Sequence, residues 1–190
     1  MRIQSHRGQS LVEFSLVLPL LLVTALGVVE VSYALLDQHI VQKLTREGSN
    51  LISRSTTLGD AATAMRTMST RPVDLTNGSK LILSVVRNVP TIGAANYNKA
   101  ILAQRYVYGN LAGKNSTIQT AGTPSFGPGP EYQALNQDSN TGLQVTNLPV
   151  TLSLGGSLYI CELYTTHPTI TPLAGFGIQV PDTLYSIAYF

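Results

Sequence analysis

The chain has few of the residues on which catalytic and metal sites depend. Its 190 residues include one cysteine, Cys161, and three histidines, His6, His39 and His167. A single cysteine excludes an internal disulfide and any cysteine-clustered metal site. The histidines are far apart in sequence and lack ligand spacing, so we expect each to have a surface or packing role. Cys161 lies in an apolar run, and we expect it to be a small buried side chain.

Charge is also scarce. Only 12% of the residues are charged, which is about half the usual share of a soluble domain. Removing Arg2 and Arg7 from the 12 basic residues leaves 10, against 10 acidic residues, so the body of the chain is neutral. It therefore offers no basic stripe for nucleic acid. Gly155-Gly156 is not followed by the Gly-Lys-Ser/Thr of a phosphate loop. We expect no cofactor, no metal and no catalytic residue, and hence no enzyme.

What the chain has instead is one very long apolar segment close to its N-terminus. Residues 11–36 contain only two charged side chains, Glu13 and Glu30. About 20 apolar residues are enough to span a bilayer. The basic residues precede this segment and Asp37 follows it. The positive-inside bias therefore predicts a cytoplasmic N-terminus and an extracytoplasmic remainder.

A cleaved secretory signal peptide is the alternative, because it too has a basic segment followed by an apolar one. Two features oppose it. The apolar segment is longer than the core of a signal peptide, and no small-x-small cleavage site follows before Asp37. The chain also has no cysteine to which a lipid could be attached there. We therefore expect the apolar helix to be retained.

The helical pattern continues beyond the apolar segment and predicts one helix from about Ser10 to Ser53. Apolar and small residues recur there at near-helical spacing, at Ile40, Val41, Leu44, Gly48, Leu51 and Ile52. At 1.5 Å per residue the helix is roughly 65 Å long, which exceeds one bilayer. Its outer half must bury its apolar stripe against a folded domain. Pro19 removes one backbone hydrogen bond and is expected to kink or loosen the helix.

The segment Arg7-Gly8-Gln9-Ser10-Leu11-Val12-Glu13-Phe14, followed by Pro19 and Gly27-Val28-Val29-Glu30, resembles the TadE-like family of pseudopilins. These are minor components of the Tad (Flp) branch of type IV pilus machinery. The resemblance covers roughly residues 7–36. It implies that a prepilin peptidase cuts between Gly8 and Gln9, which makes Glu13 the fifth residue of the mature chain. A weaker similarity lies in Tyr164 and Thr171-Pro172-Leu173.

The chemistry of these residues is compatible with that implication. Gly8 lacks a Cβ atom, so a peptidase can approach its backbone closely. After cleavage Gln9 would carry a free α-amino group beside lipid, and Glu13 of a neighbouring subunit could neutralise it. A carboxylate at the centre of a membrane helix costs about 2.5–3.5 kcal/mol and therefore needs a reason. We assign Glu13, with Phe14, to subunit docking. The alternative is a glutamate at the membrane edge whose side chain only extends to the water and has no docking role.

Glu30 lies near the expected outer membrane face, 17 residues after Glu13. A carboxylate at this interface costs little. Hydration and contact with a partner are equally compatible with the sequence, so Glu30 is a possible interface residue.

The rest of the chain predicts a small α+β domain. Asn77-Gly78 is a turn signal, and residues 109–147 predict a flexible, partly ordered loop that crosses the sheet or presents a surface. Gly155-Gly156 predicts a hairpin turn. The expected elements are a helix at 58–69 and strands at 80–89, 100–108, 150–154, 157–166 and 183–190, with the second and third of these segments (80–89 and 100–108) paired antiparallel.

Together these features predict three parts: a cytoplasmic leader at 1–8, a long helix at 9–53 with a transmembrane half at 11–36, and an extracytoplasmic headgroup at 54–190. The long helix is expected to pack on the antiparallel sheet, as in a pilin. The expected partners are the bacterial inner membrane, a prepilin peptidase, other pilins or pseudopilins and the pilus assembly platform. The expected location is the inner membrane or an extracellular pilus used for surface attachment. The alternatives are an unprocessed, membrane-anchored binding module and, less compatible with the missing site chemistry, a tethered enzyme.

Overall fold

The computed structural model describes residues 8–172, 175, 177 and 181–190. The basic head with Arg2, His6 and Arg7, and also Leu173, lie outside the described residues. The elements are α1 (Gln9–Ser53), α2 (Leu58–Met68), β1 (Ser79–Asn88), β2 (Ala100–Gly109), η1 (Thr141–Leu143), β3 (Ser157–Thr166) and β4 (Thr183–Tyr189).

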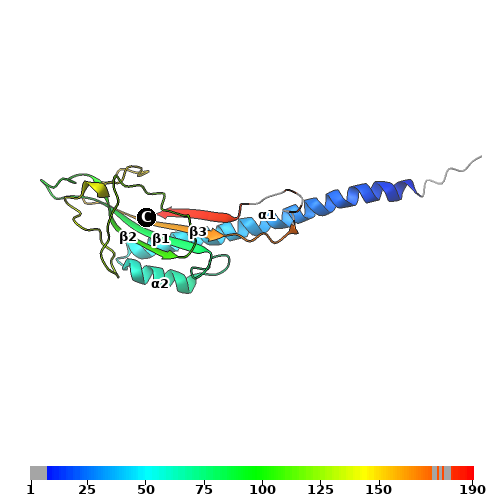
Figure 1. Cartoon of the computed structure of the whole chain (residues 1–190), viewed down its shortest axis with the longest axis horizontal. Helices are drawn as coiled ribbons and strands as arrows, with labels where there is room; N and C mark the ends of the chain where they lie inside the picture. Colours follow the sequence, from blue (N-terminus) through cyan, green and yellow to red (C-terminus); the bar gives the residue numbers. More distant parts are fainter. Residues whose placement is uncertain (1–7, 173–174, 176, 178–180) are drawn as a thin grey trace, which may run out of the picture.

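Helix α1 is continuous over 45 residues, as the sequence predicts, and runs through Pro19 without interruption. Its first half extends as a rod from one end of the folded part, and its second half lies along that part (Figure 1). Three hydroxyl side chains of the first half donate to backbone carbonyls three or four residues earlier, at Ser15, Thr24 and Ser32. Hydroxyl groups satisfied in this way are compatible with lipid surroundings.

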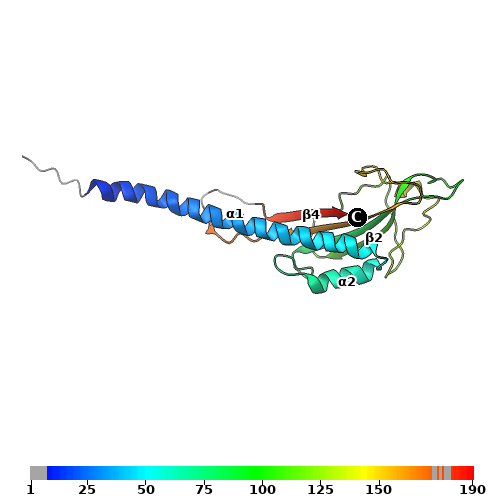
Figure 2. The same ribbon diagram turned by 180° about the vertical axis from the view of Figure 1, so that it is seen from behind.

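The sheet has four antiparallel strands in the order β2-β1-β3-β4. The predicted pairing of the two strands after α2 is confirmed, with Leu83 opposite Tyr106 in β2 and Cys161 in β3. Helix α1 packs against β3, β4 and α2, and both helices lie on the same side of the sheet (Figure 2). The predicted α+β class, a long helix followed by a small antiparallel sheet, is confirmed.

The predicted strand Val150–Leu154 is wrong. These residues are irregular, although a turn does precede β3, with Gly156 N–H donating to the Ser153 carbonyl at 2.8 Å and Gly155 at φ +75°. The reason lies in the sheet: β1 occupies one edge of β3 and β4 the other, so no edge is left for a hairpin partner. Alternating residues alone do not show which edges are already occupied.

The two faces of the sheet have different coverings. The helix face contributes Leu81, Leu83, Cys161 and Leu163 to a core shared with α1 and α2. On the opposite face, Val86, Leu102, Leu158 and Ile160 pack with Ile118 and other apolar residues of the irregular segment 110–156. That segment crosses the sheet, which is one of the two alternatives predicted for residues 109–147. It covers the face of the sheet opposite the helices.

Gly48 is the point at which α1 comes closest to its neighbours. A Cβ added there would lie 2.5 Å from Met65 Sδ of α2 and 2.6 Å from Cys161 Sγ of β3. Only glycine allows this approach without displacing a neighbour. Cys161 is buried, as expected, and burial raises the pKa of its thiol far above the usual range, so it is kept as an unreactive thiol.

Candidate functional site

The predicted processing end lies where α1 begins. Gly8 is the N-cap residue and Gln9 the first helical residue, and the Val12 N–H donates to the Gly8 carbonyl at 3.3 Å. Gly8 is exposed, and a Cβ atom added to it would meet nothing within 4 Å. Space within this chain therefore does not require glycine at position 8.

The predicted docking residues lie on the uncovered half of α1. Glu13 is exposed and Phe14 is 62% exposed. The most apolar stretch of α1 has none of its residues buried in the structure, and the helix is long and apolar enough to cross a membrane. No other described part of the chain covers this stretch.

Glu30 is different, because its side chain is only 1% exposed. Its Oε2 atom accepts from the Thr171 N–H at 2.8 Å and from the Thr171 hydroxyl at 2.7 Å. The Ile170 N–H donates to both carboxylate oxygens at 3.2 Å. The sequence left hydration and contact with a partner molecule as alternatives for Glu30, and the structure shows a contact within the same chain instead. The carboxylate holds the segment that follows β3 against α1.

His167 lies beside this contact. Its Nδ1 atom is 2.8 Å from Asp37 Oδ2, and its Nε2 atom is 3.9 Å from Glu30 Oε1. The ring is fully buried, and Nε2 has no hydrogen-bond partner among the described residues. The contact with Asp37 fixes the orientation of the ring. We call Glu30, Asp37, His167, Ile170 and Thr171 the α1 clasp.

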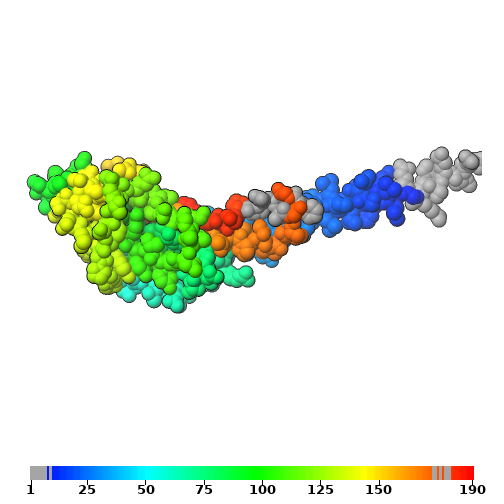
Figure 3. Space-filling model, viewed as in Figure 1, coloured from blue at the N-terminus to red at the C-terminus, as the bar shows by residue number. Residues whose placement is uncertain are grey.

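The α1 clasp joins residues 130 to 141 positions apart in the sequence. In the space-filling view, the segment after β3 lies directly along α1 (Figure 3). The backbone N–H of His167 also donates to the backbone carbonyl of Asp182 at 2.7 Å. The residue that follows β3 therefore lies beside the residue that precedes β4. The weaker similarity seen in the sequence therefore falls on two parts that contact α1. Tyr164 belongs to strand β3, and Thr171-Pro172 belongs to the segment that follows it.

A second buried carboxylate, Glu162 of β3, was not singled out by sequence reasoning. It is fully buried on the sheet face that the irregular segment covers. Its Oε1 accepts from the Thr117 N–H at 2.8 Å and the Thr117 hydroxyl at 2.7 Å, and also from the Tyr185 hydroxyl at 3.0 Å. The Ser116 hydroxyl donates to Oε2. One charged residue within the apolar run SLYICELYTT was the available signal.

Arg105 completes this group. It donates from Nη2 to Ser116 Oγ at 2.9 Å and from Nε to Ser84 Oγ at 3.0 Å. Burial lowers the pKa of its guanidinium, and the charge of Glu162 partly opposes that effect. Burial is also the main reason why the pKa of Tyr185 is raised well above its usual range. These are the properties of a group that fastens a loop to a sheet.

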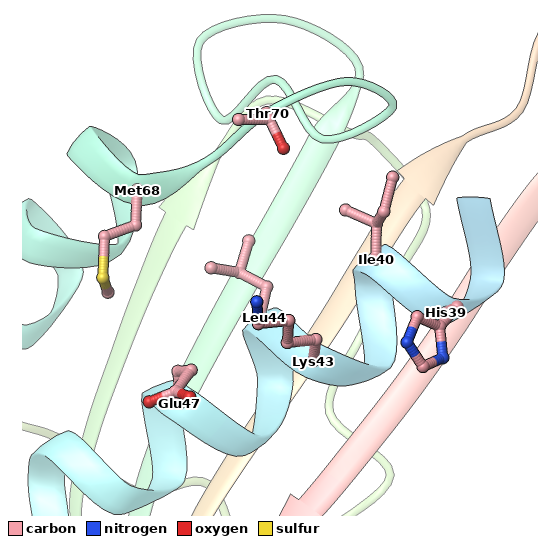
Figure 4. Close-up of a pocket in the computed structure, with 7 residues that line it drawn as sticks. All are labelled: His39, Ile40, Lys43, Leu44, Glu47, Met68 and Thr70. Atoms are coloured by element: carbon pink, nitrogen blue, oxygen red, sulfur yellow. The ribbon is translucent and has the colours of Figure 1, made fainter. Parts of the chain in front are cut away.

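Two grooves of the surface lie along α1. The larger one, of about 600 Å³, lies between α1 and α2 and is lined by Ile40, Leu44, Met68 and Thr70, with His39, Lys43 and Glu47 from α1 (Figure 4). A second groove, of about 400 Å³, continues from Ile40 toward the clasp. Among the described residues, no three His, Cys, Asp or Glu side chains are placed to hold a metal ion.

Comparison with known proteins gives one match. A family model described as TadE-like protein matches residues 8–50. This match confirms the resemblance seen in the sequence of the N-terminal segment. The TadE-like segment contains Gly8, Glu13, Pro19 and Glu30, and it ends within the part of α1 that packs on the sheet. No curated protein and no solved structure matches the chain.

Proposed function

We propose that the chain is a pseudopilin or minor pilin that takes part in assembly of a Tad-type pilus for surface attachment. The observation that carries the proposal is the TadE-like match over residues 8–50, which includes a helix with an uncovered apolar half. A helix of this kind fits two environments, the bilayer before assembly and a bundle of other helices afterwards. The protein is structural in this proposal, not catalytic.

A prepilin peptidase cuts between Gly8 and Gln9, at the cytoplasmic edge of the inner membrane. The exposed Gly8 at the helix start supports this step, because its backbone is open to another molecule. Glu13 and Phe14 then dock the subunit, with the Glu13 carboxylate near the new α-amino group of a neighbour. Pairing makes incorrect register unfavourable, because both charges would otherwise stay buried without a partner. Pro19 removes one backbone hydrogen bond between these residues and the outer half, and this loosens the helix locally although its helical path is continuous.

N-terminal sequencing of the native protein tests the processing step. Gln9 as the first residue is expected. An intact Met1 would contradict the proposal and favour an unprocessed, membrane-anchored binding module. Gly8→Val is expected to block the cut, while His39→Ala, on an exposed part of α1 far from the cut, leaves it unchanged.

Glu13→Ala tests docking separately from processing. The variant is expected to be cut normally and to be absent from sheared filaments and from co-purified assembly complexes. Glu47→Ala, which removes an exposed carboxylate of the same helix, serves as the control and is expected to be incorporated. Normal incorporation of Glu13→Ala would exclude the docking role. Immunogold labelling of sheared filaments and of membranes then places the subunit at tip, shaft or base.

A further inference from the structure

The groove beside the α1 clasp lies at a definite depth if α1 spans the membrane as proposed. The span from Leu11 to Val29, in which Glu13 is the one charged residue, is about 28 Å long at 1.5 Å per residue, close to the roughly 30 Å of a hydrocarbon core. Glu30, buried by the clasp, then lies at the outer boundary. Tyr33 and Leu36 follow by about 4.5 and 9 Å. This distance places them among the lipid headgroups, not in open water.

The groove of about 400 Å³ is built around these residues. Tyr33, Leu36 and Ile170 line it and are 47%, 54% and 56% exposed, although all three are large apolar or aromatic side chains. Tyrosine is enriched at the membrane interface because its ring is apolar and its hydroxyl is polar. The two sides of the groove come from α1 and from the segment after β3, which the clasp holds together.

The groove contains one exposed cation. Arg71, from the turn after α2, lines it together with Pro72, and no hydrogen bond or ion pair joins Arg71 to another residue in the described part of the chain. Asp37 also lines the groove, but its carboxylate is engaged by His167 at 2.8 Å. At the depth of the lipid headgroups, a guanidinium can bind the phosphate of a phospholipid. The apolar side chains beside it can contact the acyl chains of the same molecule.

We propose that this groove binds a phospholipid of the extracytoplasmic leaflet, with the phosphate at Arg71 and the upper acyl chain against Tyr33, Leu36 and Ile170. Lipid binding at this site would keep the folded domain, residues 54–190, in contact with the bilayer before assembly. This inference rests on the proposed function insofar as it needs α1 to span the membrane. The depth of α1 and the occupancy of the groove can be measured separately.

The experiment uses the full chain in vesicles of phosphatidylethanolamine and phosphatidylglycerol. An environment-sensitive thiol dye is attached in separate variants, Ile170→Cys at the groove, Leu20→Cys in the span and Ile92→Cys at the exposed β1–β2 connection. Cys161 is buried and does not compete for the dye. Each variant is quenched by nitroxides placed either at the lipid headgroup or at the centre of the acyl chains.

The dye at position 170 is expected to be quenched mainly from the headgroup, that at position 20 mainly from the acyl chains, and that at position 92 by neither. Arg71→Glu in the Ile170→Cys background is expected to lower headgroup quenching about fivefold, the effect of one arginine at a membrane surface; Arg71→Lys largely preserves it. Quenching at position 20 with none at position 170 would overturn the lipid site alone. Absence of quenching at position 20 would overturn the membrane span as well. An unchanged signal in Arg71→Glu would exclude phosphate recognition by Arg71.

Discussion

Glu30 and Glu162 are both buried, at 1% and 0% exposure, yet they lie in very different parts of the molecule. Each carboxylate accepts the N–H and the hydroxyl of a single threonine, Thr171 for Glu30 and Thr117 for Glu162. Each threonine belongs to an irregular segment. The same chemistry therefore fastens two segments that have no strand of their own to hold them.

The surroundings differ. Glu162 has a half-buried cation close by, since Arg105 donates to the same Ser116 hydroxyl that contacts the carboxylate. Among the described residues, the basic side chain near Glu30 is His167, at 3.9 Å, and Glu30 lies beside the uncovered half of α1. The comparison indicates that Glu162 supports the fold as a whole. Glu30 supports only the junction between the helix and the headgroup.

Glu162→Ala is expected to have the largest effect. The Thr117 N–H then lacks its acceptor and the half-buried Arg105 lacks its counter-charge. Because the lost carboxylate is fully buried, the free energy of unfolding should fall by about 3–5 kcal/mol. Denaturant unfolding of the full chain in detergent measures it. Glu131→Ala, an exposed carboxylate of the same irregular segment, is the control and should change stability by less than about 0.5 kcal/mol. Equal effects of the two variants would remove the distinction between Glu162 and a surface acid.

Glu30→Ala is expected to act locally. The Ile170 and Thr171 amides lose their acceptor, at a cost of about 1–3 kcal/mol for the groups involved. Hydrogen exchange should therefore accelerate at these two amides while β1 and β3 stay protected. Glu47→Ala, elsewhere on α1, should leave the same amides unchanged. Loss of protection throughout the sheet would show that Glu30 supports the whole fold, and the proposed difference between the two carboxylates would be wrong.

Thr171→Val and Thr117→Val test whether the two contacts are equivalent. Valine keeps the backbone N–H and the shape but removes the hydroxyl, so each variant should lose about 1 kcal/mol. For Thr117→Val the loss should be visible in global unfolding, and for Thr171→Val in local exchange at the clasp. If both losses appear in global unfolding, the clasp and the sheet unfold as one unit.

The sequence allowed the helical half of this structure to be predicted better than the irregular half. Helix α1 and the four strands follow from periodicity, because apolar spacing directly reflects which face is buried. The strand at Val150–Leu154 failed because local pattern does not show that both edges of β3 are occupied. Glu13 and Glu30 stood out because they interrupt an apolar run.

Glu162 interrupts an apolar run too, but it lies in a strand, where one polar residue usually indicates a solvent-facing side. Its partners Ser116, Thr117 and Arg105 come from a segment whose path over the sheet has no periodic signal. The clasp has the same difficulty, since Thr171 is 141 residues from Glu30. Contacts made by irregular segments depend on the completed tertiary structure, so the sequence showed the carboxylates without their partners.

Alkaline pH provides the smallest and most selective test of the comparison. The folded-state pKa of Tyr185 lies above its ordinary value of 10.0, chiefly because of burial. The folded state therefore favours the protonated tyrosine. The stability that this contributes is fully present below about pH 10 and decreases above it. The chemical reason is that ionised Tyr185 would place a phenolate 3.0 Å from the Glu162 carboxylate.

Unfolding measured across this pH range should show part of the alkaline loss in the wild type and less of it in Tyr185→Phe. Burial also raises the pKa values of Tyr106, Tyr164 and Tyr189, so the difference between the two proteins, and not the total loss, is the quantity to compare. Hydrogen exchange at Thr117 should accelerate first, whereas the Thr171 amide at Glu30 has no tyrosine donor and should follow only global unfolding. Simultaneous exposure of both amides would mean that ionisation of Tyr185 does not act through Glu162.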